Sequence, residues 1–459
     1  MTAPAEWPDG PLLAYYGDDF TGSTDAMEAM SAAGVPTVLF LDTPSPDMLA
    51  RFPQARCIGI AGSSRGRGLE WMDAELPKAF SALSALKVPV LHYKVCSTFD
   101  SSPSTGSIGR AIDLGVRHQT GRWSPTIVGS PRLKRYQVFG HLFAAVDGVG
   151  HRLDRHPTMS RHPVTPMTES DLRRHLAAQT ARRIELIDML QLRQGTAARR
   201  VDELQGDDVP VVFIDVLDDE TLAAAGRLVW EHRGTGLFSA SSSGLQYALA
   251  AYWRELGLLP KEASLPAAEA VPAIAVVSGS CSPVTASQIA WAREHGFRVE
   301  RLQLPHALDE RTRESEIERV VGIAMTSLAQ GISPLVYSAE GPDDATVVGF
   351  DAIAREAGLP RADAARRVGA TLADVMRRLL NRAPLKRIVV AGGDSSGEVA
   401  SALDLQALTV SAGLAPGAPI CRVWSNVAQR DGLEIVLKGG QIGGANFFGI
   451  ARDGGRRTG

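Results

Sequence analysis

Short apolar segments that end in a loop of glycine, serine or charged residues recur along the whole chain. The first, Leu12 to Tyr16, enters the loop Gly17 to Asp25, and similar segments lie at residues 37–41, 57–61, 90–94, 126–129, 209–214, 237–239, 273–277, 298–302, 334–337, 387–391 and 434–437. Apolar runs of this length fit buried strands, and the longer amphipathic stretches between them fit helices. Strands that alternate with helices form parallel sheets, whose ligands bind at the carboxyl ends of the strands. The sequence therefore predicts an α/β fold with mainly parallel sheets and functional residues in the loops that follow strands.

The chain is long enough for two domains. Its 459 residues exceed what one ordinary hydrophobic core organises. Residues 257–271 are rich in Pro, Ala and Glu and lack strong periodicity, which is typical of a linker. We predict a first domain at residues 1–256, a linker at 257–271, a second domain at 272–459 and an active-site cleft between the two domains.

Composition excludes several classes of function. The net charge of -3 argues against a nucleic-acid partner, which normally requires a basic surplus. No apolar run approaches the roughly 20 residues that span a bilayer, and residues 1–10 lack the pattern of an export signal. The four cysteines are widely separated, as expected for free thiols in a reducing compartment. We expect a cytoplasmic protein with no membrane partner, and the sequence leaves a homo-oligomer open.

The loop after the first strand carries two adjacent carboxylates, Asp18 and Asp19. A helix is predicted from Ala26 to Ala33, with Ser23 or Thr24 as its cap. Carboxylates at the edge of a sheet can orient a sugar hydroxyl, take its proton or hold a metal ion. An isolated acidic pair is more often a capped turn with one solvated carboxylate, so the residues alone leave both interpretations open.

Cationic side chains follow two other strands of the first domain. Arg65 lies in the glycine-rich loop 62–68, where it could clasp a carboxylate or belong to a mobile surface loop. Lys94 ends the strand at 90–94 and reaches the same sheet edge. Residues 106–109 open a helix whose free amides could hold an anion. The histidines at 151, 156 and 162 match no compact metal site, so we predict no protein-held metal.

Three loops of the second domain have the composition of phosphate-binding loops. Each follows a predicted strand, and they lie at residues 278–283, 392–397 and 438–444. Glycine lets backbone amides approach phosphate oxygens closely, and Lys438 adds positive charge. Neither a Walker pattern nor a dinucleotide fingerprint after a first strand is present, which disfavours a P-loop or a Rossmann dinucleotide site.

Five of these segments together resemble the motifs of the four-carbon acid sugar kinases. Gly-Asp-Asp-Phe-Thr-Gly-Ser-Thr-Asp at residues 17–25 resembles the opening motif of that family, and His-Pro-Val-Thr-Pro-Met at 162–167 resembles its His-Pro-x-Thr-Pro-Met segment. The loops that begin at Ser278, Gly392 and Lys438 resemble its three nucleotide loops. The motifs occur in family order over nearly the whole chain.

The resemblance implies phosphoryl transfer from ATP, with Mg²⁺, to a hydroxyl of a small sugar acid. The first domain would hold the acid and the second would hold ATP. Asp18 or Asp19 would be the catalytic base, and we prefer Asp19 because it lies deeper in the loop. Arg65 would bind the substrate carboxylate. The substrate-binding residues would be Asp18, Asp19, Ser64, Arg65, Lys94, Ser97 and Thr98. The nucleotide-binding residues would be Ser278, Gly279, Ser280, Ser282, Gly392, Gly393, Asp394, Ser395, Lys438, Gly439, Gly440 and Gly443.

One motif departs from the family pattern Lys-x-Asp-Ser-Thr-x-Arg-Gly. The chain keeps Lys94, Ser97 and Thr98, but it has Cys96 for the Asp and Asp100-Ser101 for the Arg-Gly. An acid thus replaces a cation, so a substrate carboxylate cannot be bound there in the same way. The substrate stays open among tetronates, 3-oxotetronates and branched sugar acids. Two alternatives also remain, a non-catalytic sugar-acid and nucleotide sensor and an α/β sugar-acid dehydrogenase, and the missing dinucleotide fingerprint disfavours the second.

Overall fold

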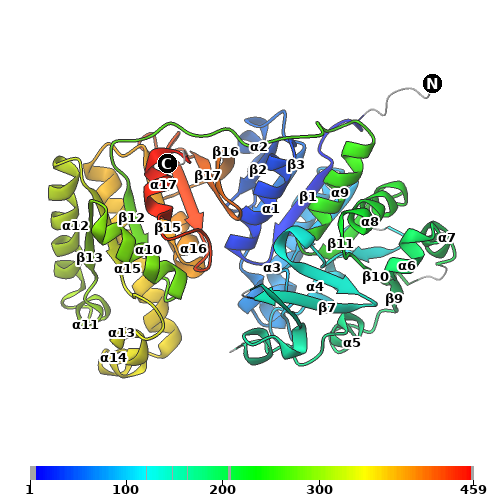
Figure 1. Cartoon of the computed structure of the whole chain (residues 1–459), viewed down its shortest axis with the longest axis horizontal. Helices are drawn as coiled ribbons and strands as arrows, with labels where there is room; N and C mark the ends of the chain where they lie inside the picture. The colour runs from blue at the N-terminus through cyan, green and yellow to red at the C-terminus, as the bar shows by residue number, and fades with distance from the viewer. Residues whose placement is uncertain (1–6, 120, 147, 163, 205–207, 456–459) are drawn as a thin grey trace. The chain divides into compact units, whose positions relative to one another are not determined.

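The computed structural model describes residues 7–119, 121–146, 148–162, 164–204 and 208–455 and divides the chain into two compact units (Figure 1). The units are residues 1–263 and 264–459, so their boundary falls inside the predicted linker. Each unit contains a mainly parallel sheet covered by helices. The predicted α/β fold is confirmed.

The main sheet of the first unit has the strand order β11-β4-β1-β3-β2, and all its pairs are parallel. Helix α1 packs with α9, and α3 packs with α4, against this sheet. Because helices cover the strands, nearly every strand residue is buried. The elements are β1 (Leu13–Gly17), α1 (Phe20–Ala32), β2 (Thr37–Phe40), α2 (Pro46–Ala50), β3 (Cys57–Ala61), α3 (Leu69–Ser84), β4 (Val90–Lys94), α4 (Ile108–Gly115), β11 (Leu237–Ser241) and α9 (Gly244–Glu255).

Two small sheets complete the first unit. One is parallel, in the order β5-β10-β9, and the other is an antiparallel meander, β6-β7-β8. The prediction of an irregular segment over 150–168 is wrong in part, because β8 and two short 3₁₀ turns occupy it. The elements are β5 (Ser124–Thr126), β6 (Arg135–Val138), β7 (His141–Val146), β8 (Val149–Arg152), α5 (Leu172–Ala177), β9 (Ile184–Ile187), α6 (Met189–Arg193), α7 (Ala197–Asp202), β10 (Val211–Ile214) and α8 (Asp219–Glu231).

The sheet of the second unit has the order β16-β17-β18-β15-β12-β14-β13. Its strands are parallel from β18 to β13, whereas β16 and β17 form an antiparallel hairpin that the sequence did not predict. The elements are β12 (Ala275–Ser278), α10 (Pro283–Glu294), β13 (Phe297–Arg301), α11 (Leu304–Leu308), α12 (Arg313–Ala329), β14 (Ser333–Tyr337), α13 (Ala345–Val348), α14 (Phe350–Glu356), α15 (Arg361–Arg382), β15 (Arg387–Ala391), α16 (Gly393–Ala402), β16 (Ala407–Ala415), β17 (Ala418–Trp424), β18 (Glu434–Lys438) and α17 (Phe447–Asp453). No helix in the described part of the chain combines the length and the apolar composition that crossing a membrane requires.

The second half of the predicted linker is bound to the second unit. The amide of Ala268 donates to the carbonyl of Gly454 at 2.9 Å, and that of Val271 donates to the carbonyl of Arg452 at 2.9 Å. The buried guanidinium of Arg387 donates to the carbonyls of Glu269 at 2.8 Å and Ala451 at 2.7 Å. Arg387 thus joins the first residues of this unit to its last helix.

Candidate functional site

The acidic loop lies where the carboxyl ends of the central strands meet. In register, Gly17 of β1 pairs with Ala61 of β3 and Lys94 of β4. Asp19 is in an extended conformation, and its side chain accepts a hydrogen bond from the amide of Gly22. It therefore caps α1, which begins at Phe20. The prediction of a Ser23 or Thr24 cap is wrong, because the carboxylate of Asp19 already satisfies the first turn.

Arg65 holds the acidic pair together. Its Nε and Nη2 atoms each lie 3.2 Å from a carboxylate oxygen of Asp18. Its Nη1 atom lies 2.7 Å from Oδ2 of Asp19. Burial opposes the charge of Arg65, but the two carboxylates outweigh this effect and raise its pKa. Every nitrogen of this guanidinium group already faces a carboxylate, so Arg65 is poorly placed to clasp a further one from a substrate.

The two carboxylates differ in enclosure. The side chain of Asp18 is 5% exposed, whereas that of Asp19 is 30% exposed. Burial raises the pKa of Asp18 to about 6 despite the opposing effect of Arg65. Asp18 is therefore the more deeply buried of the two carboxylates. The expectation that Asp19 lies deeper in the loop, which was the reason for preferring it as the base, is wrong. Accessibility favours Asp19 instead, because a substrate hydroxyl can reach it.

The raised pKa of Asp18 predicts an acid limb in the activity profile. Above pH 6 its carboxylate is ionised and can pair with Arg65, and below pH 6 it gains a proton and the pair weakens. We expect kcat/KM for the acidic substrate to fall about tenfold per pH unit below 6, where an ordinary aspartate would hold activity to about pH 4. A profile that stays flat down to pH 5 would contradict this role. Burial also raises the pKa of Asp215 to about 6, so Asp215→Asn is the control and should keep the same limb.

Lys94 reaches the same place from β4. It is buried, and its Nζ atom lies 3.8 Å from Oδ2 of Asp25. A Cβ atom on Gly22 would lie 2.8 Å from this ammonium group. The lack of a side chain at Gly22, in the first turn of α1, therefore permits the close approach of Lys94 to the start of this helix.

The loop after β4 presents a third carboxylate, Asp100, which is buried. Asp100 accepts hydrogen bonds from the Thr98 hydroxyl at 2.6 Å and the Thr165 hydroxyl at 3.4 Å. Burial opposes its ionisation, but Arg65 and Thr98 outweigh this effect and lower its pKa. The Cys96 thiol lies 3.0 Å from the Thr98 hydroxyl. Phe99, which lies between Thr98 and Asp100 in the chain, has a φ of 55°. This backbone conformation is strained for an aromatic residue, and such strain often occurs at functional sites.

Other predicted groups of the first unit have different surroundings. Ser97 is half-buried, and the Ser64 hydroxyl pairs with the Tyr93 hydroxyl at 2.8 Å in the interior. The expectation of a free anion site at the start of α4 is wrong, because Oε1 of Gln179 accepts from the amides of Ile108 and Gly109. Among the described residues, no group of three or more His, Cys, Asp or Glu side chains could hold a metal ion. Pro163 of the His-Pro motif lies outside the described residues.

The three glycine loops meet at one edge of the sheet in the second unit. Ser278 pairs with Ala391, and Ala391 pairs with Lys438, so all three strands end together. A Cβ atom on Gly279 would lie 2.1 Å from Oγ of Ser395, and one on Gly440 would lie 2.8 Å from Oγ of Ser280. The loops therefore pack so closely that a side chain at position 279 or 440 would displace a neighbouring serine. Gly392 has a φ of 119° and precedes α16, which begins at Gly393; the side chain of Asp394 is outside the described part.

Two residues of α10 fix the third loop, and sequence reasoning missed both. The hydroxyl of Thr285 donates to the carbonyl of Gly440 at 3.0 Å. The amide nitrogen of Gln288 donates to the carbonyl of Ile442 at 2.9 Å and also reaches those of Gly443 and Gly444. Their spacing of three residues, which places both on one helix face, was the available signal. Ser282 caps the same helix and also donates to Gly440 at 2.7 Å.

Lys438 is fully buried at the centre of these loops. Its Nζ atom donates to the Thr285 hydroxyl at 3.0 Å, and within the described residues no carboxylate forms an ion pair with it. Burial lowers its pKa to about 8. The Ser278 hydroxyl is also buried without a hydrogen-bond partner there. Both groups would gain an interaction from an anionic ligand.

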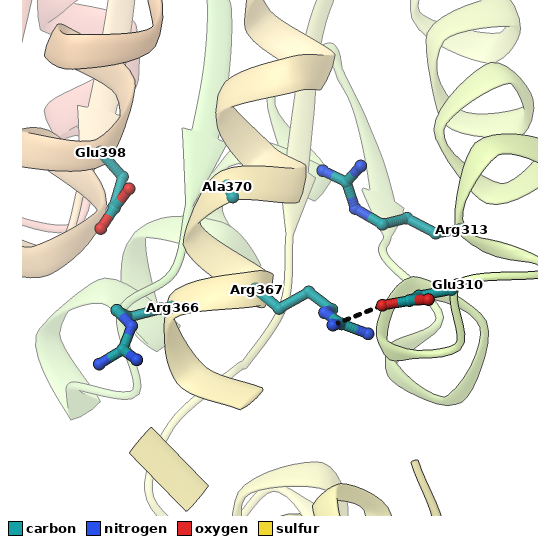
Figure 2. A pocket seen from close by; sticks show the side chains of 6 residues that line it. All are labelled: Glu310, Arg313, Arg366, Arg367, Ala370 and Glu398. Atoms are coloured by element: carbon teal, nitrogen blue, oxygen red, sulfur yellow. Dashed lines mark hydrogen bonds and ion pairs between the residues drawn. The ribbon is translucent and has the colours of Figure 1, made fainter. Parts of the chain in front are cut away.

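Two hollows open on the surface of the second unit. One, of about 470 Å³, is lined by residues 414–416 and 441–444 together with Phe447, Ile450 and Gly455, so it adjoins the third glycine loop. The other, of about 460 Å³, is lined by Glu310, Arg313, Arg366, Arg367, Ala370 and Glu398 (Figure 2). In the second hollow Arg367 pairs with Glu310 at 3.0 Å and Arg313 pairs with Asp374 at 2.6 Å. These pairs neutralise much of its positive charge.

The chain thus consists of an α/β unit with a charged polar cluster and an α/β unit with three glycine loops, and comparison with known proteins identifies both as the units of a sugar kinase. Residues 13–249 match a family described as a sugar-binding N-terminal domain, and residues 275–448 match one described as a nucleotide-binding C-terminal domain. The chain belongs to the four-carbon acid sugar kinase family.

Full-length relatives support this assignment. The chain is 70% identical to the 3-oxo-isoapionate kinase of Paraburkholderia graminis over 98% of this chain and 95% of that protein. It is 31% identical to the 3-oxo-tetronate kinase of Pseudomonas savastanoi pv. phaseolicola over 95% of this chain and 96% of that protein. A solved structure from Salmonella typhimurium LT2 shares the fold with a TM-score of 0.78, 24% identity and coverage of 96% and 98%. One from Haemophilus influenzae has a TM-score of 0.71, 24% identity and coverage of 96% and 100%.

Proposed function

We propose that this sugar-acid kinase transfers the γ-phosphoryl group of ATP to a hydroxyl of a 3-oxo sugar acid, and that 3-oxo-isoapionate is its first substrate candidate. The 70% identity to a 3-oxo-isoapionate kinase over almost the whole chain carries the choice of substrate. The runner-up is 3-oxo-tetronate, the substrate in the names of relatives near 30% identity. We also propose that the reaction takes place in the cytoplasm.

In this proposal the acidic loop supplies the base. The accessible carboxylate of Asp19 takes the proton of the attacking hydroxyl, while its cap to α1 and its pair with Arg65 fix its position. Asp18 fixes Arg65 from the enclosed side. Lys94 supplies a positive charge beside the acceptor hydroxyl, and Ser97 and Thr98 are proposed as further substrate contacts. Ser64, which is buried and paired with Tyr93, supports the site from the interior.

The glycine loops supply the phosphate site. The backbone amides of Gly393 and Gly440 would hold the phosphate oxygens, and Lys438 would regain its full charge beside them. The amides of Gly279 and Gly392 donate to the carbonyls of Ala391 and Lys438, so these two glycines position the loops. The hollow of about 470 Å³ next to the third loop suits the purine base. Mg²⁺ would arrive with ATP, since this ion is usually bound by phosphate oxygens, water and one or two carboxylates.

Release of ADP in the presence of Mg²⁺ tests the proposal. The protein is incubated with ATP and, in turn, 3-oxo-isoapionate, 3-oxo-tetronate, D-threonate and D-erythronate. We expect kcat/KM to be highest for 3-oxo-isoapionate. If the 3-oxo acids bind but release no ADP, the protein is a sensor; if a nicotinamide cofactor is consumed instead, it is a dehydrogenase.

A further inference from the structure

Arg135, the first residue of β6, is a cation that no carboxylate among the described residues pairs with. Its Nη1 atom donates to the carbonyls of Leu133 at 3.1 Å, Lys134 at 3.2 Å and Ala145 at 3.4 Å. Its Nε atom is buried and has no hydrogen-bond partner among the described residues, where Arg135 also forms no ion pair with a carboxylate. Guanidinium groups carry five N–H donors, and leaving a buried donor unpaired is costly. The unpaired donor therefore indicates a ligand that accepts a hydrogen bond.

Two buried hydroxyls that have no partner among the described residues belong to segments that adjoin Arg135. The backbones of Ser130 and Arg135 exchange hydrogen bonds of 2.8 and 3.1 Å, so their side chains leave the same face of the pair. The hydroxyls of Ser130 and Ser243 are fully buried and find no partner in the described part of the chain. Ser243 precedes Gly244, where a Cβ atom would lie 2.3 Å from the carbonyl of Gly129. The start of α9 thus packs directly against Gly129 and Ser130.

This cluster adjoins the proposed substrate site. Ser241, the last residue of β11, precedes Ser242 and Ser243. It is in register with Lys94 of β4, and its backbone carbonyl accepts a hydrogen bond from the amide of Val95 at 2.8 Å. Cys96, the next residue, interacts electrostatically with both Arg65 and Arg135. The guanidinium groups of Arg65 and Arg135 therefore both lie near the Cys96 thiol. Burial, together with the positive charge of Arg135, lowers the pKa of His156, so its imidazole is neutral at pH 7.

Building on the proposed function, we propose that Arg135, Ser130 and Ser243 bind the carboxylate of the sugar acid. Arg65 already serves Asp18 and Asp19, and Asp100 would repel a carboxylate at the position where the family pattern has a cation. A guanidinium group and two hydroxyls are the donors that a carboxylate needs. Arg135 is thus a specificity-determining residue that selects acids over neutral sugars.

The substitution Arg135→Gln tests the cation. We expect KM for 3-oxo-isoapionate, or for 3-oxo-tetronate if that is the better substrate, to rise ten- to hundredfold, because a charge-assisted hydrogen bond is lost. KM for ATP should stay within about twofold. Arg135→Lys should recover part of the affinity for the acid. If KM for the acid and KM for ATP rise equally, or if the Gln and Lys variants behave alike, the proposal is overturned.

Substitution of Ser243 distinguishes an effect on substrate binding from an effect on stability. Removing a buried hydroxyl that lacks a partner should not lower the melting temperature, so a loss caused by Ser243→Ala must come from the ligand. We expect this variant to raise KM for the acid about five- to tenfold without lowering Tm. The matched control is Ser124→Ala at the start of β5, which removes another buried hydroxyl without a partner and should change neither value.

Calorimetry with a neutral analogue makes the result independent of turnover. The wild-type protein should bind 3-oxo-isoapionate at least tenfold more tightly than its carboxamide, and Arg135→Gln should bind the two about equally. An undiminished preference for the acid in the variant would overturn the role of Arg135. If the wild-type protein releases no ADP with any acid but still prefers the acid to the amide, the proposed function fails while this inference stands.

Discussion

Asp19→Asn is expected to lower kcat by about 10²–10⁴-fold, the range that a positioned general base contributes. The substituted amide keeps an oxygen that can cap α1, and Arg65 keeps its two contacts with Asp18. The fold and both KM values should therefore change little. Steady-state kinetics with the preferred acid, together with a thermal melt, measures the two effects separately.

Asp18→Asn is the companion measurement. This change weakens the hold on Arg65 from the enclosed side, so we expect a higher KM for the acid and a smaller loss of kcat. A larger kcat loss in Asp18→Asn than in Asp19→Asn would exchange the two roles. If both variants stay within about threefold of the parent, well below the range of general-base catalysis, the acidic pair is not catalytic.

Lys438→Met is expected to raise KM for ATP about ten- to hundredfold and yet leave the protein as stable as before, or more stable. The charge–phosphate hydrogen bond is lost, whereas the buried ammonium group, whose pKa burial lowers to about 8, no longer has to be accommodated. Activity and Tm should therefore move in opposite directions. Lys386→Met, which replaces an exposed lysine just before β15, is the control and should affect neither.

The lowered pKa of Lys438 predicts that the affinity for ATP falls at basic pH. Above pH 8 the side chain loses its proton and its attraction for phosphate, so the apparent Kd for ATP should rise about fivefold between pH 8 and 9. In Lys438→Met this dependence should disappear. A wild-type affinity that is constant up to pH 10 would show that Lys438 does not contact the phosphates.

The sequence was most informative where local patterns decide structure. The strands at Cys57–Ala61, Val90–Lys94 and Arg387–Ala391 have the predicted bounds, because each is a short, mainly apolar run that ends in a lysine or is followed directly by a glycine. The antiparallel strands β6, β7 and β8 alternate weakly and carry several polar residues, so no period marked them. The hairpin of β16 and β17 was missed for a similar reason.

Within the candidate site, the sequence located the loops but could not give the pairing of their charges. It identified both Arg65 and Asp19, yet the capping of α1 by Asp19 and the saturation of Arg65 depend on the approach of two distant loops. Arg135 was passed over because its buried Nε atom, which has no partner in the described part of the chain, is a feature of the folded chain alone. The burial of Lys438, and hence its low pKa, is likewise a property of the assembled loops.

The hydrogen bonds that Arg387 donates to both ends of the second unit determine where this unit can be cut to be produced by itself. A fragment that starts at residue 272, where the sequence alone would place the cut, omits Glu269 and removes one of the backbone carbonyls to which this buried guanidinium group donates. A fragment shortened before Ala451 removes another. A recombinant domain for crystallisation or ligand screening should therefore span residues 264–455, and an affinity tag should be fused beyond both limits.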